Sequence, residues 1–378
     1  MNVDSAFSDA TELNLKLQSL LKEHVNLSLD VLRNAYNGRS DFDESEAALD
    51  KNTVELAETI GSVYGSDAQA EFQKIWRDHI GFFAQHTTGL ATNDQELIDL
   101  WKENLEQYSQ DIADFFSWAI PLVMRDTIVS GSSEHARLLL ESMEAYDRAN
   151  YDRAYELQIE ADTQIEWVAN LLSKWIVDQY PNNFSDYNID DQEMARTSKS
   201  SMLRLELNDL LREHVNVSLD VLRNAYTGSS DFNEFEAALD KNTVELAETI
   251  GSVYGSDAQA AFLKIWRDHI GFFAQHTTGL AENDEDLIAL GEANLEQYRL
   301  DIAEFFSGAI PFVDRETVIA GSGEHARLLL ESMEAFDRGD YSAAYELQMQ
   351  ADNQIQGIAD LLTKGITMQN PELFEASE

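Results

Sequence analysis

Four pairs of histidines are the residues of this chain best suited to bind a ligand. They are His24 and His214, His79 and His269, His86 and His276, and His135 and His325, and the two members of each pair are 190 residues apart. Three of the four pairs directly follow a carboxylate, as in Glu23-His24. Imidazole nitrogens are common protein ligands of Zn²⁺, Cu²⁺ and Fe²⁺, so the first chemistry to consider is metal binding.

Several of these histidines occupy positions where the helical pattern calls for a hydrophobic residue. His24 lies between Leu20 and Leu27, and His79 follows Ile75 and Trp76. Such spacing places an imidazole on the buried side of an amphipathic helix, while the preceding acid lies about 100° around the helix at its rim. Three helices would then bring three imidazoles together, and the flanking acids could accept hydrogen bonds from them.

An amide or carboxylate on a further helix could complete such a site. Asn52 interrupts an apolar stripe between Leu49 and Leu56, and Asp162 interrupts another between Ala154 and Ile165. The predicted metal ligands are therefore His24, His79, His135, Asn52 and Asp162, followed by their counterparts His214, His269, His325, Asn242 and Asp352. His86 is the weakest candidate among the histidines, because it lies near a predicted helix end.

Two other interpretations stay open. Buried His, Asn and Asp side chains are often hydrogen-bonded residues that only fix helix packing, which would make the protein a structural or surface-associated interaction module. A metal-bound water could instead support a hydrolytic enzyme. The sequence contains no Glu-x-x-His, His-Glu-x-x-His, EF-hand, Gly-rich phosphate loop or Gly-x-Ser-x-Gly motif, so direct support for catalysis is small.

The elements that must position these residues come twice. Residues 13–176 reappear as 203–366, and the run from Glu46 to Gly65 recurs unchanged from Glu236 to Gly255. Apolar spacing and turn residues in the first copy predict helices at 13–36, 43–64, 66–88, 94–119, 133–148 and 151–176, with a shorter segment before the fifth. The expectation is an all-α protein of two tandem homologous up-and-down bundles of about six helices, at 1–180 and 203–378, joined by a polar linker at 181–202.

The charge of the chain excludes several partners. Seventy acidic and 26 basic residues give a formal net charge of −44, which repels nucleic acid and anionic lipid. The acidic surface fits adaptation to high salt or, alternatively, the collection of metal cations. No stretch of the sequence is apolar enough to span a membrane. The chain is expected either in the cytoplasm of a halophile or outside the cytoplasm after removal of a signal peptide.

Four tryptophans of the first copy are replaced by glycine in the second. Trp101, Trp118, Trp167 and Trp175 correspond to Gly291, Gly308, Gly357 and Gly365. Losing one buried tryptophan costs about 3–5 kcal/mol, so four such losses in a single core would exceed ordinary stability. One interpretation is self-association through the helices that carry these tryptophans, and the alternative is neutral surface drift.

The order of several short motifs resembles that of a known group of proteins. Leu-Lys-Glu-His-Val, Asn52, Trp-Arg-Asp-His-Ile, Glu-Gln-Tyr-Ser-Gln-Asp-Ile-Ala-Asp-Phe-Phe and Glu134-His135 follow one another, and the copy closes on Ala-Asn-Leu-Leu-Ser-Lys. This order resembles a group of bacterial helical-bundle proteins of unassigned activity that carry Glu-His pairs on successive helices. The resemblance implies the six-helix fold. Those proteins tend to have a histidine where this chain has Asp162 and Asp352.

Overall fold

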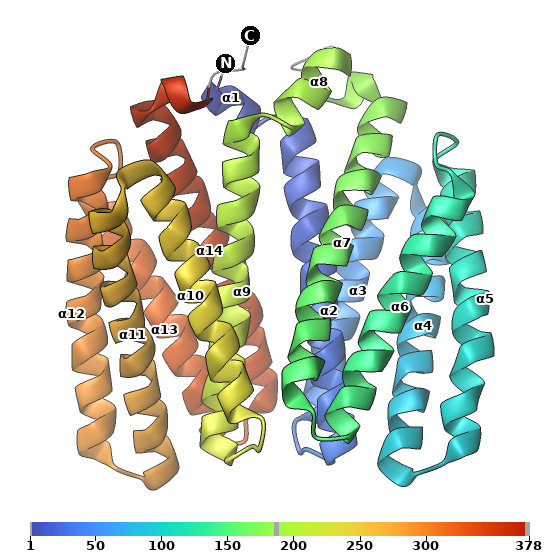
Figure 1. Cartoon of the computed structure of the whole chain (residues 1–378), viewed down its shortest axis with the longest axis horizontal. Helices are drawn as coiled ribbons and strands as arrows, with labels where there is room; N and C mark the ends of the chain where they lie inside the picture. The colour runs from blue at the N-terminus through green and yellow to red at the C-terminus, as the bar shows by residue number, and fades with distance from the viewer. Residues whose placement is uncertain (1, 185–188, 375–378) are drawn as a thin grey trace. The chain divides into compact units, whose positions relative to one another are not determined.

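Every regular element in the described part of the chain is a helix. The computed structural model describes residues 2–184 and 189–374. The chain divides into two compact units, which we call the N-terminal unit (Glu12–Glu193) and the C-terminal unit (Met1–Thr11 with Met194–Glu378). Within each unit the long helices run alternately up and down (Figure 1). The predicted all-α class is therefore confirmed.

The helices of the two units correspond closely. Those of the N-terminal unit are α2 (Asp9–Asn37), α3 (Phe42–Tyr64), α4 (Ser66–Thr92), α5 (Gln95–Ala119), α6 (Arg125–Asp147) and α7 (Tyr151–Gln179). Those of the C-terminal unit are α9 (Lys199–Thr227), α10 (Phe232–Tyr254), α11 (Ser256–Glu282), α12 (Glu285–Ala309), α13 (Arg315–Asp337) and α14 (Tyr341–Gln369). Consecutive helices pack side by side, as short connections between long helices require.

Two helices extend beyond their predicted ends because glycine serves a packing purpose there. Helix α4 continues past Gly89 to Thr92, and a Cβ at Gly89 would lie 2.9 Å from the backbone nitrogen of Ile98 on α5. Helix α6 begins at Arg125 and passes through Gly131, where a Cβ would lie 3.3 Å from the Trp167 ring on α7. These glycines allow neighbouring helices to approach closely, so they do not end the helices in which they lie.

The segment predicted as a polar linker is partly ordered into helix. It contains the 3-10 turn η1 (Pro181–Asn183), helix α8 (Ile189–Arg196) and the beginning of α9, and residues 185–188 of this segment lie outside the described residues. The short helix α1 (Asn2–Ala6) belongs to the C-terminal unit, where the guanidinium of Arg204 donates a 2.9 Å hydrogen bond to the Ala6 carbonyl. The same guanidinium is paired with Asp360. The initial segment is thus attached by a buried arginine.

Each unit has its own hydrophobic core. In the N-terminal unit the core takes residues from all six long helices, such as Leu21, Leu56, Phe72, Ile112 and Leu139. The equivalent helices supply the core of the C-terminal unit. Burying leucine and phenylalanine side chains contributes about 1.5–3 kcal/mol each and accounts for the association of the amphipathic helices. Among the described helices, none is long and apolar enough to cross a membrane.

The four tryptophans that differ between the copies have different environments. Trp175 is buried in the core of its own unit, Trp101 is half-buried, and Trp118 and Trp167 are 66% and 47% exposed. At the counterpart of Trp175, a Cβ on Gly365 would lie 2.6 Å from Val313 Cγ2, so closer packing replaces the lost ring. Self-association stays a prediction, and the exposed Trp118 and Trp167 are the residues available for it.

Candidate metal centre

Three buried histidines from three helices meet in each unit. His24 on α2, His79 on α4 and His135 on α6 form the first group, which we call the N-terminal triad. His214 on α9, His269 on α11 and His325 on α13 form the C-terminal triad. In each triad one nitrogen from every imidazole lies within 4.8 Å of the other two. All six side chains are at most 2% exposed.

The closest pair in each triad comes from the first and third long helices of the unit. The Nε2 atoms of His24 and His79 are 3.3 Å apart, and those of His214 and His269 are 3.2 Å apart. The ring of the third histidine lies 5.9 Å from the ring of the first, measured between centroids, in both units. The two copies have therefore kept the same geometry.

Aromatic rings enclose each triad. The ring of Tyr108 stacks on His79 with centroids 4.5 Å apart, and Tyr298 stacks on His269 at the same distance. Trp76 also contacts both His24 and His79. These rings fix the orientation of the imidazoles and keep bulk water away from them.

Several imidazole nitrogens make no hydrogen bond to the protein. Both nitrogens of His135 and both of His325 are buried without a partner. Leaving a buried polar atom unsatisfied costs about 1–3 kcal/mol, so such atoms in a native site call for a ligand or another explanation.

The two units differ in one hydrogen bond. In the N-terminal triad, the indole nitrogen of Trp76 donates to His24 Nδ1 at 3.3 Å. Because indole is only a donor, Nδ1 of a neutral His24 must be unprotonated and its proton must be on Nε2. In the C-terminal triad, the Trp266 indole nitrogen and His214 Nδ1 have no hydrogen-bond partner.

The triad histidines are held in their neutral form. Burial, followed by the neighbouring His79 and His135, lowers the pKa of His24 well below its usual 6.5. Burial, and then His135, lowers the pKa of His79 to about 3, and burial lowers the pKa of His135 to about 4. The same causes give the same directions in the C-terminal triad. Neutral imidazoles offer lone pairs, so protons compete little with a metal.

The two predicted asparagine ligands bond to the helical turn that carries the first histidine of each triad. The side-chain nitrogen of Asn52 donates to the Leu20 carbonyl at 3.0 Å and to Glu23 at 2.8 Å. Its Oδ1 atom is buried without a hydrogen-bond partner, as is Oδ1 of Asn242. The Asn52 amide thus binds α3 to the turn of α2 that carries His24, and its Oδ1 atom accepts no hydrogen bond.

The two predicted aspartate ligands are not brought into the triads. Asp352 is buried and accepts hydrogen bonds from the guanidinium of Arg212 and from Asn216 at 3.2 Å. Asp162 is half-buried. Among the described residues, the groups of three that could hold a metal include neither aspartate.

The acids that precede the histidines make other contacts. Glu23 accepts from Asn52, Asp78 pairs with Lys74 at 3.0 Å, and Glu134 pairs with Arg137 at 2.6 Å. These ion pairs join residues one helical turn apart at the surface, as expected for acids at the rim of a helix. Asp78 and Glu134 therefore bond to basic side chains.

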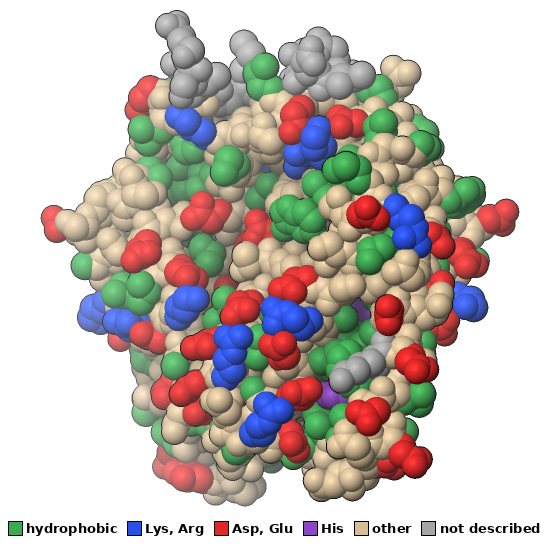
Figure 2. Space-filling view, turned by 45° about the vertical axis from the view of Figure 1, so that its right-hand side comes forward, with side chains coloured by type: hydrophobic (Ala, Val, Ile, Leu, Met, Phe, Trp, Pro, Cys, Tyr) green, Lys and Arg blue, Asp and Glu red, His purple; other side chains and the backbone are tan. Residues whose placement is uncertain are grey.

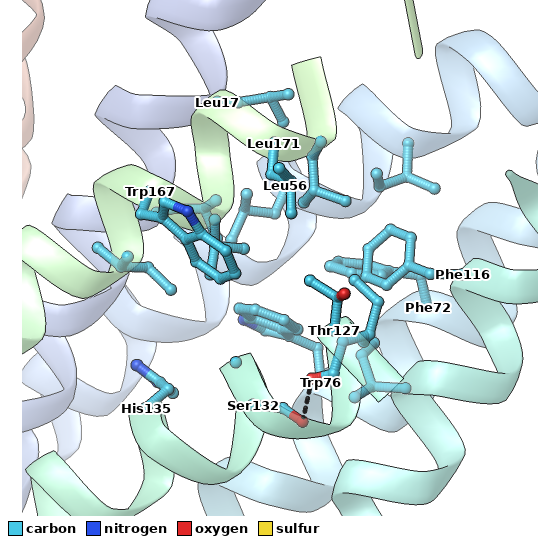
Figure 3. Close-up of a pocket in the computed structure, with 18 of the residues that line it drawn as sticks. Leu17, Leu56, Phe72, Trp76, Phe116, Thr127, Ser132, His135, Trp167 and Leu171 are labelled. Atoms are coloured by element: carbon cyan, nitrogen blue, oxygen red, sulfur yellow. Dashed lines mark hydrogen bonds between the residues drawn. The ribbon is translucent and has the colours of Figure 1, made fainter. Parts of the chain in front are cut away.

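An apolar cavity of about 50 Å³ adjoins the N-terminal triad. His135, Trp76 and Tyr108 line it on the side of the triad, and the half-exposed Trp167 lines it on α7. Figure 3 shows His135 and Trp167 on the same side of this space, with Phe72 and Phe116 opposite. Thr127 and Ser132 supply hydroxyls, and none of the described lining residues is a carboxylate. The cavity is an apolar space beside the imidazoles.

A third group in the C-terminal unit was missed because its acids lie far apart in the sequence. His276, Glu292 and Glu334 also place one ligand atom each within 4.8 Å of one another. The signal that could have revealed it is a difference between the copies, since Glu292 corresponds to Lys102.

Comparison of the chain with models of protein families, with curated proteins and with solved structures found no match in any of the three.

Proposed function

We propose that each unit binds one divalent transition-metal ion through its histidine triad, and that this binding is not catalytic. The observation that carries the proposal is the convergence of three buried, neutral imidazoles whose nitrogens lie within 4.8 Å of one another, repeated in both units. A core that needed only packing would be served better by leucine at His135 and His325. Both nitrogens of these two residues are buried without a protein partner.

The distances favour a small tetrahedral ion. Two nitrogens bound to one Zn²⁺ at about 2.0–2.1 Å lie about 3.3 Å apart in a tetrahedron. The Nε2 atoms of His24 and His79 are 3.3 Å apart, and those of His214 and His269 are 3.2 Å apart. Imidazole ligands also suit Cu²⁺ and Fe²⁺, which remain alternatives to Zn²⁺. The unused Oδ1 atoms of Asn52 and Asn242 are candidates for completing each shell.

Metal binding at His24 requires a change in its protonation. If Nε2 binds the metal, the neutral ring must carry its proton on Nδ1, where it opposes the indole N–H of Trp76. Binding in the N-terminal unit therefore costs the Trp76 hydrogen bond.

The alternative function is that of a structural module, and one observation favours it. In the N-terminal unit, Trp76 donates to His24, and the Nε2 atoms of His24 and His79 can share a proton. These two hydrogen bonds satisfy three of the nitrogens in the N-terminal triad without any ion. It leaves His135 unexplained, and the Trp76 bond is absent from the C-terminal unit.

Metal content separates these functions. We expect untagged protein, purified without chelator, to contain about two equivalents of one transition metal by elemental analysis. His325→Ala should remove one equivalent, and His135→Ala combined with His325→Ala should remove both. Equal metal content and equal uptake of Zn²⁺, Cu²⁺ or Fe²⁺ in the wild type and in the double variant would establish the structural alternative.

A further inference from the structure

Among the described residues, the C-terminal unit contains a cluster of potential ligands for which no counterpart is found in the N-terminal unit. His276 on α11, Glu292 on α12 and Glu334 on α13 form this group, which we call the surface cluster. The corresponding residues of the N-terminal unit are His86, Lys102 and Glu144. Lysine at the position of Glu292 would supply a positive charge in place of a metal ligand. The N-terminal unit is therefore a natural control for metal binding by this cluster.

His276 is the buried member of the surface cluster. Its side chain is fully buried, and neither Nδ1 nor Nε2 makes a hydrogen bond. Nε2 lies 3.8 Å from Oε1 of Glu334, which is beyond hydrogen-bond distance. The imidazole therefore faces a carboxylate without bonding to it, at a separation that an ion bound to both groups could bridge.

The two carboxylates connect this imidazole with solvent. Glu292 is exposed, and the side chain of Glu334 is 37% exposed. The second oxygen of Glu334 lies 3.7 Å from Arg338, which leaves its first oxygen directed at His276. Burial is the main cause that raises the pKa of Glu334, and the nearby Glu292 and Glu331 add to it. A cation at this position would relieve that repulsion.

The replacement of tryptophan by glycine beside this cluster keeps His276 clear of a large ring. In the N-terminal unit, Trp101 packs edge-on against His86, with ring centroids 5.6 Å apart. In the C-terminal unit the same position is Gly291, where a Cβ would lie 2.9 Å from both the Cβ and the backbone nitrogen of His276. The backbone of α12 thus lies directly against His276, and the next residue along that helix is Glu292.

We propose that His276, Glu292 and Glu334 form an additional divalent-cation site, open to solvent and specific to the C-terminal unit. One imidazole and two carboxylates make a harder, more oxygen-rich ligand set than three imidazoles, which suits Mn²⁺ as well as Zn²⁺. Solvent access leaves room for water ligands. The site therefore exchanges its ion with the medium, and it does not depend on metal binding at the triads.

Titration with Mn²⁺ tests this site, because electron paramagnetic resonance of the aqueous ion counts what remains free. We expect Glu292→Lys, which installs the residue of the N-terminal unit, to remove one bound Mn²⁺ per chain. Glu292→Gln and Glu334→Gln should each weaken binding about tenfold or more, since losing a group that only orients a metal ligand already costs about that much. Unchanged Mn²⁺ stoichiometry and affinity in Glu292→Lys would overturn the proposal.

Two controls make the result specific. Glu316→Lys makes the same change of charge at a side chain that is 78% exposed, 18 residues and so about 27 Å along α13 from Glu334. It should change Mn²⁺ affinity less than about twofold, and an effect equal to that of Glu292→Lys would show only general attraction to an acidic surface. His325→Ala should leave the Mn²⁺ site intact, which separates failure of this site from failure of the triads.

Discussion

Trp76 donates a hydrogen bond to His24 at 3.3 Å, whereas the equivalent atoms of Trp266 and His214 have no partner. This is the main difference between two triads that are otherwise built alike. In the metal-free N-terminal unit, this hydrogen bond requires the proton of neutral His24 to be on Nε2. The first expectation below depends on it.

Removing the indole donor should strengthen metal binding in the N-terminal unit. Trp76→Phe abolishes the hydrogen bond that competes with protonation of His24 Nδ1. Because one hydrogen bond contributes about 1 kcal/mol, we expect affinity for Zn²⁺ to rise about fivefold, as measured by competition with a chromophoric chelator. Trp266→Phe is the matched control and should leave the affinity of the C-terminal triad unchanged. Equal effects of the two substitutions would contradict this account of the protonation.

Leucine in place of the third histidine should stabilise the metal-free protein. His135→Leu removes two buried nitrogens that have no protein partner, so we expect the free energy of unfolding to rise by about 1 kcal/mol without metal. The same variant should lose the additional stability that Zn²⁺ gives to the N-terminal unit. Urea unfolding with and without Zn²⁺ measures both effects. Destabilisation of the metal-free variant would favour a structural role for His135.

Acid should destabilise the metal-free protein through its buried histidines. Burial holds the pKa of His79 and His269 at about 3 and that of His135 and His325 at about 4. The pKa of histidine in the unfolded chain is about 6.5, so below that pH the unfolded state binds more protons than the folded state. Stability is therefore complete above about pH 6.5 and decreases as the pH falls toward 4.

Unfolding measured between pH 7 and 5 checks this dependence. Each such histidine contributes a slope of up to about 1.4 kcal/mol per pH unit. The combined variant His135→Leu and His325→Leu should show a shallower slope than the wild type, because two titrating groups have been removed. A slope that these substitutions do not change would assign the acid sensitivity to other groups.

Asp352 should matter for folding and not for metal binding. Its carboxylate is buried with Arg212 and Asn216, and removing one member of a buried ion pair typically costs about 3–5 kcal/mol. We expect Asp352→Asn to destabilise the C-terminal unit by an amount of this order and to leave metal stoichiometry unchanged. Asp162→Asn is the control at a half-buried position and should cost less. Loss of one equivalent of metal in Asp352→Asn would restore this aspartate as a ligand.

The sequence predicted the all-α fold because the apolar pattern and the capping residues agree along the chain. Asp94, for instance, begins α5 by accepting from the backbone nitrogens of Glu96 and Leu97. The pattern also brought the three histidines of each copy to buried faces, where the structure joins them. The prediction placed helix ends beside Gly89 and Gly131, but the structure continues both helices through these residues. A glycine that ends a helix and a glycine that permits close packing look the same in sequence.

The partners of the polar residues were not predictable in the same way. Arg212 and Asp352 lie on α9 and α14, 140 positions apart, and their pairing depends on the rotation of both helices. The surface cluster likewise takes its three members from three helices. Helical periodicity shows which side of a helix is buried, but it does not show which side chain of another helix lies opposite.

The exposed acids are spread over the face shown in Figure 2, and they outnumber the basic residues there. Such a surface attracts cations everywhere, so an ion gains little from charge alone at any one place. Selection among ions must come from ligands that are fixed before the ion arrives.

The close approach of α12 to α11 at Gly291 makes the divergence of the two copies difficult to reverse. A side chain at this position would meet the backbone of His276, so tryptophan cannot be placed there unless the helices first separate. Either copy can change further at exposed positions, but the two are no longer interchangeable one residue at a time. At this position the two copies therefore pack their helices in two different ways.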